Sequence, residues 1–283
     1  MSIVSLPAAV PLFLVGISST FAADSPPVRV PSRIAKEAET LQQNGTRILT
    51  RETLAQRSLV PPGARLRIRD VVSEFSFGTR RGSLSHHLPE FRRVLSVDGT
   101  PIQSVDTARR ALSEGDDRAR KRMLQEAART GLADIATDYS LILQEFTAAD
   151  QEQMDISPSA SCDIGTDPAL AFLWKQRSAE SRLTEFHGRE SVHRPLQGTL
   201  WVRASDGLPL RINAWMEYDD QDGNRIRADA SVDYVLSQLR FLTPASVIHH
   251  HLVNGSLVIE NLYLYEPFQF FSASSNISFG SPK

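Results

Sequence analysis

The sequence predicts an α+β fold built on a curved antiparallel sheet, and three observations carry this prediction. Residues 28–155 mix helical spacing with a few strands, whereas residues 168–280 alternate apolar and polar side chains in one segment after another. Tight turns such as Asp206-Gly207 and Asn254-Gly255 separate these segments. Six or more antiparallel strands joined in this way form a curved sheet or a partial barrel. We treat residues 23–283 as a single domain.

The chain begins with an apolar run over residues 5–23, followed by a polar, proline-rich break. The run is too short to span a membrane comfortably, and two prolines interrupt it. Thr20 and Ala22 fit the −3 and −1 positions of a signal-peptidase site. The segment therefore predicts a signal peptide over residues 1–22 and an exported protein, periplasmic or extracellular. No Lys or Arg precedes the run, so an uncleaved membrane anchor is the alternative.

The first half contains three segments with helical spacing and two with strand alternation. The helical segments are residues 32–56, 105–132 and 138–146, and the strands are residues 65–77 and 90–97. Ser32 can cap the first helix, and Asp98-Gly99 indicates a hairpin after the second strand. Residues 105–132 are rich in arginine. We interpret them as a solvated helix whose charge nearby acidic residues balance, with a membrane-surface or partner-binding helix as the alternative.

The second half reads as a meander of strands with one apolar face. The predicted strands are residues 169–176, 182–186, 198–204, 209–218, 225–236, 245–253, 257–265 and 273–279. Only one register buries the apolar set of residues 209–218, because a slip by one residue would expose it. We therefore expect Ile212 and Val232 to point toward the helices, Arg211 to reach solvent, and Trp215 to lie on the convex face.

Composition narrows the classes of function. The net charge of −2 argues against a dedicated binder of nucleic acid or anionic membranes, since both demand a basic excess over the surface. Cys162 is the only cysteine and cannot form an internal disulfide. We expect it to be a small buried residue, with a nucleophile as the alternative.

Two patterns suggest chemistry, but neither is complete. His249-His250-His251 would need a third ligand such as His187 or His193 to bind zinc, and we predict no metal. The segment from Asp220 to Asn224 starts like a calcium loop but lacks the closing glutamate, so a hairpin turn is favoured. No nucleophile elbow, P-loop or dinucleotide fingerprint is present. We predict no cofactor and no enzymatic activity.

The final third of the chain resembles a known family. The matching motifs are residues 198–203 (GTLWVR), 206–212 (DGLPLRI), 232–234 (VDY), 242–247 (LTPASV), 259–265 (IENLYLY) and 278–279 (SF). In this order they are similar to the sheet of periplasmic lipoprotein-carrier (LolA-like) half-barrels. The chain after the signal peptide is also similar to a family of uncharacterised exported bacterial proteins.

The resemblance implies a curved antiparallel half-barrel sheet wrapped around helices, with an apolar concave face that can hold acyl chains. The ligand-facing positions would be Leu210, Ile212, Met216, Val232 and Tyr234. Our leading hypothesis is a monomeric, non-enzymatic protein that binds a lipid, another apolar ligand or an envelope partner, and not nucleic acid. One alternative is a structural or interaction module whose own helices fill the sheet, and a second is an unrecognised hydrolase.

Overall fold

Strands from both halves of the chain form one sheet. The computed structural model describes residues 32–59, 66–78, 90–101, 139–178, 185–187, 190–192 and 194–271. Its helical elements are α1 (Ser32–Asn44), η1 (Gly45–Arg47), η2 (Tyr139–Phe146) and α4 (Ala148–Gln151). Its strands are β1 (Ile48–Ser58), β2 (Arg67–Phe77), β3 (Glu90–Val97), β4 (Thr100–Pro101), β5 (Met154–Ile164), β6 (Asp167–Gln176), β7 (Glu185–His187), β8 (Glu190–Val192), β9 (Gln197–Arg203), β10 (Pro209–Asp219), β11 (Arg225–Leu236), β12 (Leu242–Val253), β13 (Ser256–Tyr265) and β14 (Gln269–Phe270).

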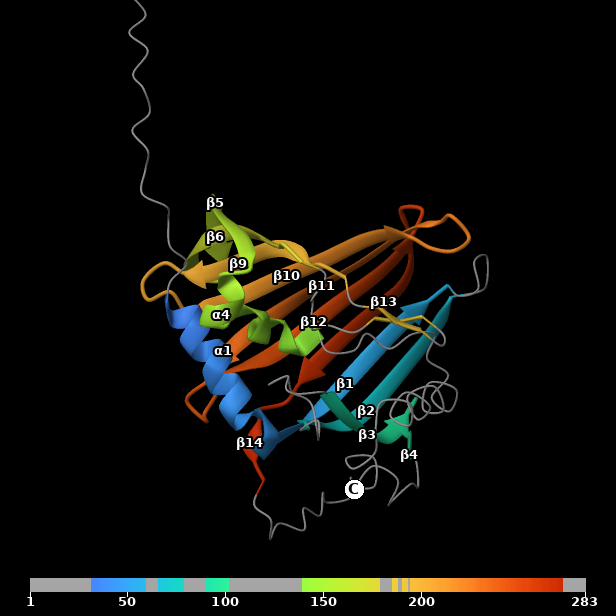
Figure 1. Cartoon of the computed structure of the whole chain (residues 1–283). Coiled ribbons are helices and arrows are strands. Elements are labelled where there is room, and N and C mark those ends of the chain that lie inside the picture. Colours follow the sequence, from blue (N-terminus) through green and yellow to red (C-terminus); the bar gives the residue numbers. More distant parts are fainter. Residues whose placement is uncertain are drawn as a thin grey trace, which may run out of the picture.

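The described strands form a 12-stranded antiparallel sheet in the order β4-β3-β2-β1-β13-β12-β11-β10-β9-β6-β5, with β14 paired to β1, and β7 and β8 form a small hairpin of their own. The sheet is open, with β5 at one edge and β4 at the other. It curves around α1, η2 and α4, which lie on its concave side (Figure 1). The predicted curved half-barrel around helices is confirmed.

The first predicted helix is too long. Residues 32–44 are helical, but β1 begins at Ile48 and lies between β2 and β13. Burial along β1 alternates from Ile48 to Ser58, which is the period of a strand. Asn44-Gly45 ends the helix, and the sheet on both sides fixes the extended form.

The other elements of the first half agree with the prediction in part. The strands at 65–77 and 90–97 are confirmed as β2 and β3, and Asp98-Gly99 forms the turn before β4 with positive φ at both residues. η2 is a 3₁₀ helix rather than an α-helix, and all eight of its residues are buried. β5 was not predicted, because its sequence contains Pro158 and most of its side chains are exposed. The predicted helix 105–132 and the predicted strand 273–279 lie outside the described residues.

The register of the second half agrees with the prediction. Ile212 lies directly opposite Val232, and both are buried against the helices. Arg211 is half-buried and Glu217 is exposed on the other face. Trp215 lies on this convex face, where the guanidinium of Arg227 covers its ring at 5.4 Å.

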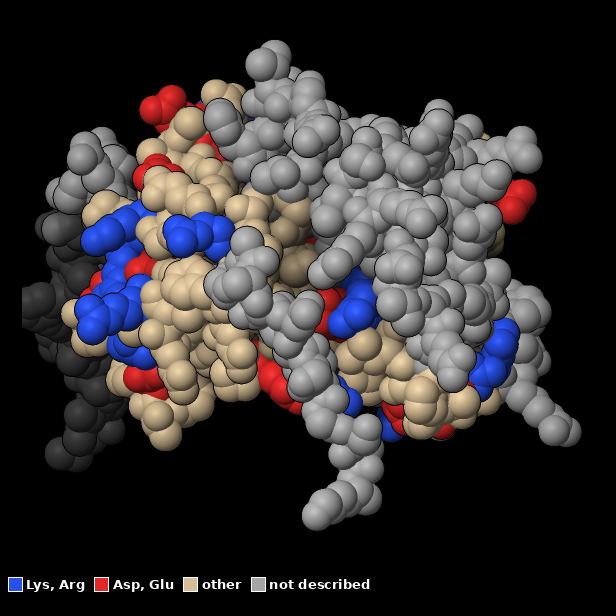
Figure 2. All heavy atoms as spheres, turned by 90° about the horizontal axis from the view of Figure 1, so that it is seen from below, with Lys and Arg blue, Asp and Glu red and all other residues tan. Residues whose placement is uncertain are grey.

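The lower end of the sheet in Figure 1 carries the turn between β11 and β12, the C-terminal end of α1, and β14. Figure 2 looks at this end and shows areas of uncharged surface with both basic and acidic side chains around them. No helix in the described part of the chain is long and apolar enough to span a membrane.

Candidate functional site

The five predicted ligand-facing positions lie together on the concave face of β10 and β11. Each is at least nine-tenths buried, and four of them belong to the main apolar core. They are Leu210, Ile212, Met216, Val232 and Tyr234. The structure therefore places all five on the predicted face. Whether a ligand contacts them stays a prediction.

η2 covers this part of the face. Tyr234 accepts a hydrogen bond from the backbone N–H of Leu143 at 3.1 Å and donates one to the carbonyl of Ser140 at 3.4 Å. Burial raises the pKa of Tyr234 above its usual value, so the phenol keeps its proton and can donate. Phe146 at the end of η2 packs edge-on against Trp174 of β6, with ring centroids 5.2 Å apart.

A buried ionic cluster on β1 and β3 fixes the other end of η2. Arg92 donates two hydrogen bonds to the carboxylate of Glu52, at 2.7 and 2.8 Å, and also lies 2.6 Å from Glu90. Glu90 in turn accepts hydrogen bonds from the hydroxyl of Ser140 at 2.5 Å and from its backbone N–H at 3.2 Å. Through this chain of contacts, β1 and β3 hold the start of η2.

The electrostatics of this cluster follow from its burial. Burial raises the pKa of Glu52 above its ordinary value, although the neighbouring Arg92 guanidinium opposes this shift. Burial also disfavours the charge of Arg92, but the carboxylates of Glu52 and Glu90 outweigh it and hold the pKa of Arg92 well above its usual range. The guanidinium is therefore permanently charged, and its two acidic partners make its burial tolerable.

A second buried polar group joins β1, β13 and β12. The side-chain amide of Gln56 donates to the Oδ1 of Asn261 at 2.8 Å, and the amide of Asn261 lies 3.1 Å from the Nδ1 of His249. In this arrangement Nδ1 accepts, so the ring proton is on Nε2. Burial lowers the pKa of His249 to about 3, and the ring is therefore neutral at pH 7. Tyr139 of η2 stacks on this imidazole, with centroids 5.1 Å apart.

The other adjacent histidines do not join His249 in a metal site. His250 faces the convex side, with Nδ1 3.0 Å from Asp229 and Nε2 3.6 Å from Glu260. His251 is half-buried. His193 and the side chain of His187 lie outside the described part of the chain. Among the described residues, no three His, Cys, Asp or Glu side chains are arranged to hold a metal ion.

Two other motifs have structural roles. Asp220 accepts hydrogen bonds from the side-chain amide of Asn224 at 3.0 Å and from the backbone N–H groups of Asn224 and Asp222 at 2.8 and 2.9 Å, and these bonds hold the pKa of Asp220 below its usual value. Gly223 has φ of +79°, so the segment is the predicted hairpin turn. The expectation for Cys162 is wrong, because this residue is exposed on the edge strand β5, where one face of the pleat meets only solvent.

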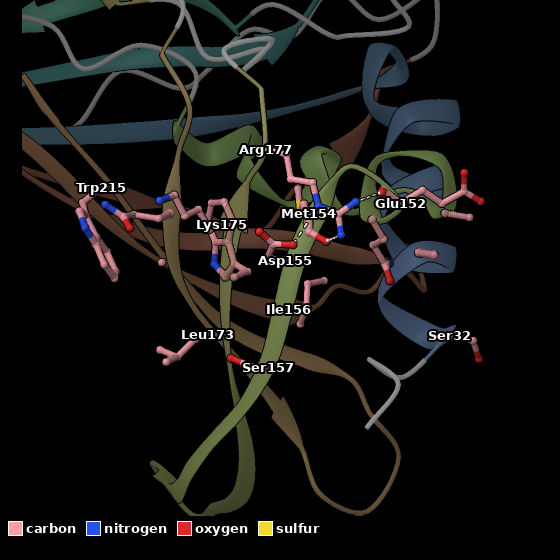
Figure 3. Close-up of a pocket in the computed structure, with 16 residues that line it drawn as sticks. Ser32, Glu152, Met154, Asp155, Ile156, Ser157, Leu173, Lys175, Arg177 and Trp215 are labelled. Atoms are coloured by element: carbon pink, nitrogen blue, oxygen red, sulfur yellow. Dashed lines mark hydrogen bonds and ion pairs between the residues drawn. The ribbon is translucent and has the colours of Figure 1, made fainter. Parts of the chain in front are cut away.

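A pocket of about 1090 Å³ lies at the β5 edge, away from the five predicted positions (Figure 3). Its lining includes Met154 and Trp174, which are buried, and Leu173 and Lys175, which are exposed. Successive residues of β6 point to opposite faces of the sheet. The pocket therefore bends around the sheet edge and is an open groove rather than a closed apolar cavity.

Ion pairs and close packing shape this groove. Arg177 donates to Asp155 at 2.8 Å and to the carbonyls of Glu152 and Met154 at 3.0 and 3.1 Å, as Figure 3 shows. Gly198 permits the indole of Trp174 to lie against β9, because a Cβ there would be 2.9 Å from the indole nitrogen and 1.8 Å from a backbone oxygen of β10. Among the lining residues no nucleophile and base converge, and Arg177 and Asp155 are engaged with each other.

Comparisons with known proteins concern the overall architecture. No family model matches the chain, and no curated protein matches its sequence. A LolA superfamily protein from Nitrosomonas europaea matches 86% of this chain and 95% of its own length, with 10% identity and a TM-score of 0.33. A domain described as an outer membrane lipoprotein-sorting protein from Vibrio parahaemolyticus matches 87% of this chain and 94% of its own length, with 7% identity and a TM-score of 0.39. A DUF1329 family protein from Desulfovibrio piger matches 87% and 93%, with 8% identity and a TM-score of 0.36.

All three TM-scores are below 0.5, and no property of these proteins is transferred to this chain.

Sequence patterns missed the polar part of the concave face. Glu52 and Gln56 alternate with the exposed polar residues Arg51, Thr53 and Arg57, so both faces of β1 look hydrophilic in the sequence. Arg92 and Glu90 lie 40 and 38 positions from Glu52, and only the pairing of β1, β2 and β3 brings them together. No local pattern in the sequence of β1 therefore pointed to this part of the face.

Proposed function

We propose that this chain is a non-enzymatic binding protein of the cell envelope, which takes a lipid or another apolar ligand on the concave face of β10 and β11. One observation carries the proposal: the short 3₁₀ segment η2 packs on β10 and β11 and is hydrogen-bonded to Tyr234, one of the five positions. The export signal predicted from Thr20 and Ala22 supports the location, and in this proposal the protein acts as a monomer.

The cover is of a kind that can be displaced. A 3₁₀ helix has poorer hydrogen-bond geometry than an α-helix, so its own backbone contributes little to holding it in place. Side chains of the sheet hold η2 instead: Tyr234 binds its middle, Glu90 binds Ser140 at its start, and Gln176 binds Glu145 near its end at 2.7 Å. A ligand with an acyl chain would replace the side chains of η2 on Ile212 and Val232 with its own methylene groups, at similar apolar burial.

The variant Tyr234→Phe tests this proposal, because it removes the hydroxyl that binds η2 and keeps the ring. Loss of these bonds should lower the free energy of unfolding by about 1 kcal/mol. If a ligand must displace η2, the same loss should raise the affinity for a fluorescent fatty acid about five-fold, since the open state becomes more populated. Titration of the probe, with native mass spectrometry for stoichiometry, measures this.

Ile259→Val is the matched control. Ile259 is equally buried on β13, and the change should cost about 0.5–1.5 kcal/mol without touching η2. Its probe affinity should equal that of the parent. An equal increase in probe affinity in the two variants would contradict the proposal. It would mean that the loss of stability, rather than the release of η2, causes probe binding.

The second candidate function is a structural or interaction module without a ligand. The observation in its favour is that η2 and the sheet form one continuous apolar core, with Ile142, Leu143 and Phe146 fully buried. In that case neither the parent nor Tyr234→Phe should bind one fatty acid per chain. Native mass spectrometry of the protein purified from its own envelope would then show the bare polypeptide mass.

A further inference from the structure

The lower end of the half-barrel exposes large apolar side chains from two distant segments. Val235 and Leu236 end β11, with exposed fractions of 49% and 53%. Phe270 of β14 and the following Phe271 are 49% and 42% exposed. We call these four residues the lower rim. Together they form an apolar surface that no described element covers.

The turn between β11 and β12 connects the two segments in space. Leu236 lies opposite Leu242 in the β11–β12 ladder, and Ser237 donates its backbone N–H to the carbonyl of Phe241 at 3.0 Å. The ring of Phe241 lies 6.4 Å from the ring of Phe270. The turn and β14 both lie at this end of the molecule, near the end of α1 (Figure 1).

Two arginines without carboxylate partners border the lower rim. The guanidinium of Arg47 lies 5.5 Å from the centre of the Phe270 ring. Arg240 is exposed in the turn, next to Phe241. Among the described residues neither forms an ion pair, whereas the nearby Arg51 pairs with Glu266 at 3.9 Å. Within the described part of the chain, the rim therefore offers positive charge without an ion-pair partner beside exposed aromatic and aliphatic groups.

The convex face provides an internal comparison. Leu264 and Ile248 are 50% and 39% exposed there, so their apolar exposure matches that of the rim. The charges beside them are paired, however: Glu260 contacts Arg57 at 3.5 Å and His250 at 3.6 Å. Among the described residues, Leu264 and Ile248 therefore lie near paired charges, whereas the lower rim lies beside two arginines that form no ion pair.

We propose that the lower rim docks on an anionic membrane surface. Bulky apolar side chains enter the boundary between head groups and acyl chains, while arginines beside them contact lipid phosphates. The net charge of −2 does not oppose this, because the contact needs a local pair of free arginines rather than a basic surface over the whole chain. The proposal goes beyond ligand binding in the concave face and does not depend on it.

Co-sedimentation with lipid vesicles tests the proposal. The protein is purified after export, with its amino terminus determined by sequencing, because the apolar residues 5–23 would bind vesicles by themselves. We expect it to bind vesicles containing phosphatidylglycerol more strongly than vesicles of phosphatidylcholine alone, and to lose this difference at high salt. Phe270→Ser should weaken the partition coefficient about ten-fold, since an inserted ring is lost. Arg240→Gln should weaken it about five-fold.

Leu264→Ser is the matched control, with the same exposure on the convex face and no change in vesicle binding expected. Equal effects of Leu264→Ser and Phe270→Ser, or no effect of Arg240→Gln, would overturn the proposal. A third outcome would also overturn the proposal: the protein does not bind vesicles, and a rim variant abolishes its self-association in sedimentation velocity. The rim would then be a contact between copies of the chain. Phe270→Ser should leave fatty-acid binding unchanged, so failure here is separable from failure of the proposed function.

Discussion

The two parts of the concave face are buried to the same degree but by opposite chemistry. On β9, β10 and β11 the inward side chains are apolar, as in Leu200, Ile212 and Val232. On β1, β12 and β13 they include Glu52, Gln56, His249 and Asn261, all at most 3% exposed. The apolar part is stabilised by the apolar area that it removes from water. It tolerates substitution by apolar side chains of another shape and similar volume. The polar part is stable only while each polar group keeps its partner.

This difference decides what each part can do. An apolar surface can exchange one apolar cover for another at small cost, so β10 and β11 suit a displaceable cover. Polar side chains instead fix η2 at defined points, since Glu90 of β3 binds Ser140 and His249 of β12 stacks on Tyr139. Substitutions that convert one chemistry into the other should therefore be the most damaging.

The largest expected effect is Ile212→Asp, which introduces a carboxylate into the apolar part. No partner for it lies nearby, and we expect a loss of more than about 4 kcal/mol of unfolding free energy or no folded protein. Arg211→Gln on the convex side of the same strand is the control. Its ion pair with Asp233, at 2.6 Å, is more than a third exposed, so the loss should be at most about 1 kcal/mol. Urea unfolding of both variants measures this, and similar losses would contradict the register.

The next effect is Arg92→Met, which removes the partner of a buried acid. Glu52 would then be left without its two charge-assisted hydrogen bonds, and we expect a loss of about 3–5 kcal/mol. The double variant Glu52→Leu with Arg92→Met removes the Glu52–Arg92 pair and leaves Glu90 with its hydrogen bonds from Ser140. It should recover much of this loss, because replacing a buried pair by apolar groups costs little. Thermal unfolding of the two proteins checks the order, and a double variant less stable than Arg92→Met would show that the pair itself stabilises the fold.

The same contrast explains how much the sequence could predict. Where one face is apolar, as from Leu210 to Tyr218, alternation predicts both the strand and the direction of each side chain, and Ile212 and Trp215 lie as expected. Where both faces are polar, as along β1, alternation is invisible, and residues 48–56 were assigned to a helix. The partners of Glu52 come from another strand, so no local pattern contains them. Long-range pairing, rather than propensity, created this part of the site.

The smallest of these effects concerns pH and belongs to His249. Burial lowers the pKa of His249 to about 3, whereas an unfolded histidine has a pKa near 6.5. Below pH 6.5 the unfolded state therefore binds a proton that the folded state does not, and stability falls as pH decreases. The contribution of His249 is complete above pH 6.5, and about 2 kcal/mol of it should be lost by pH 5.

His249→Gln isolates this dependence, because glutamine does not titrate. Glu52 acts in the opposite sense: its raised pKa means that it contributes stability at low pH and loses it as pH rises above 4.5. That contribution is present in both proteins and cancels in the difference between them. Urea unfolding at pH 7, 6 and 5 should therefore give a steeper loss for the parent than for His249→Gln. Parallel stability curves for the parent and His249→Gln would mean that acid opens the polar part of the concave face and lets water reach His249. The apolar part has no titratable group that could respond to pH in this way.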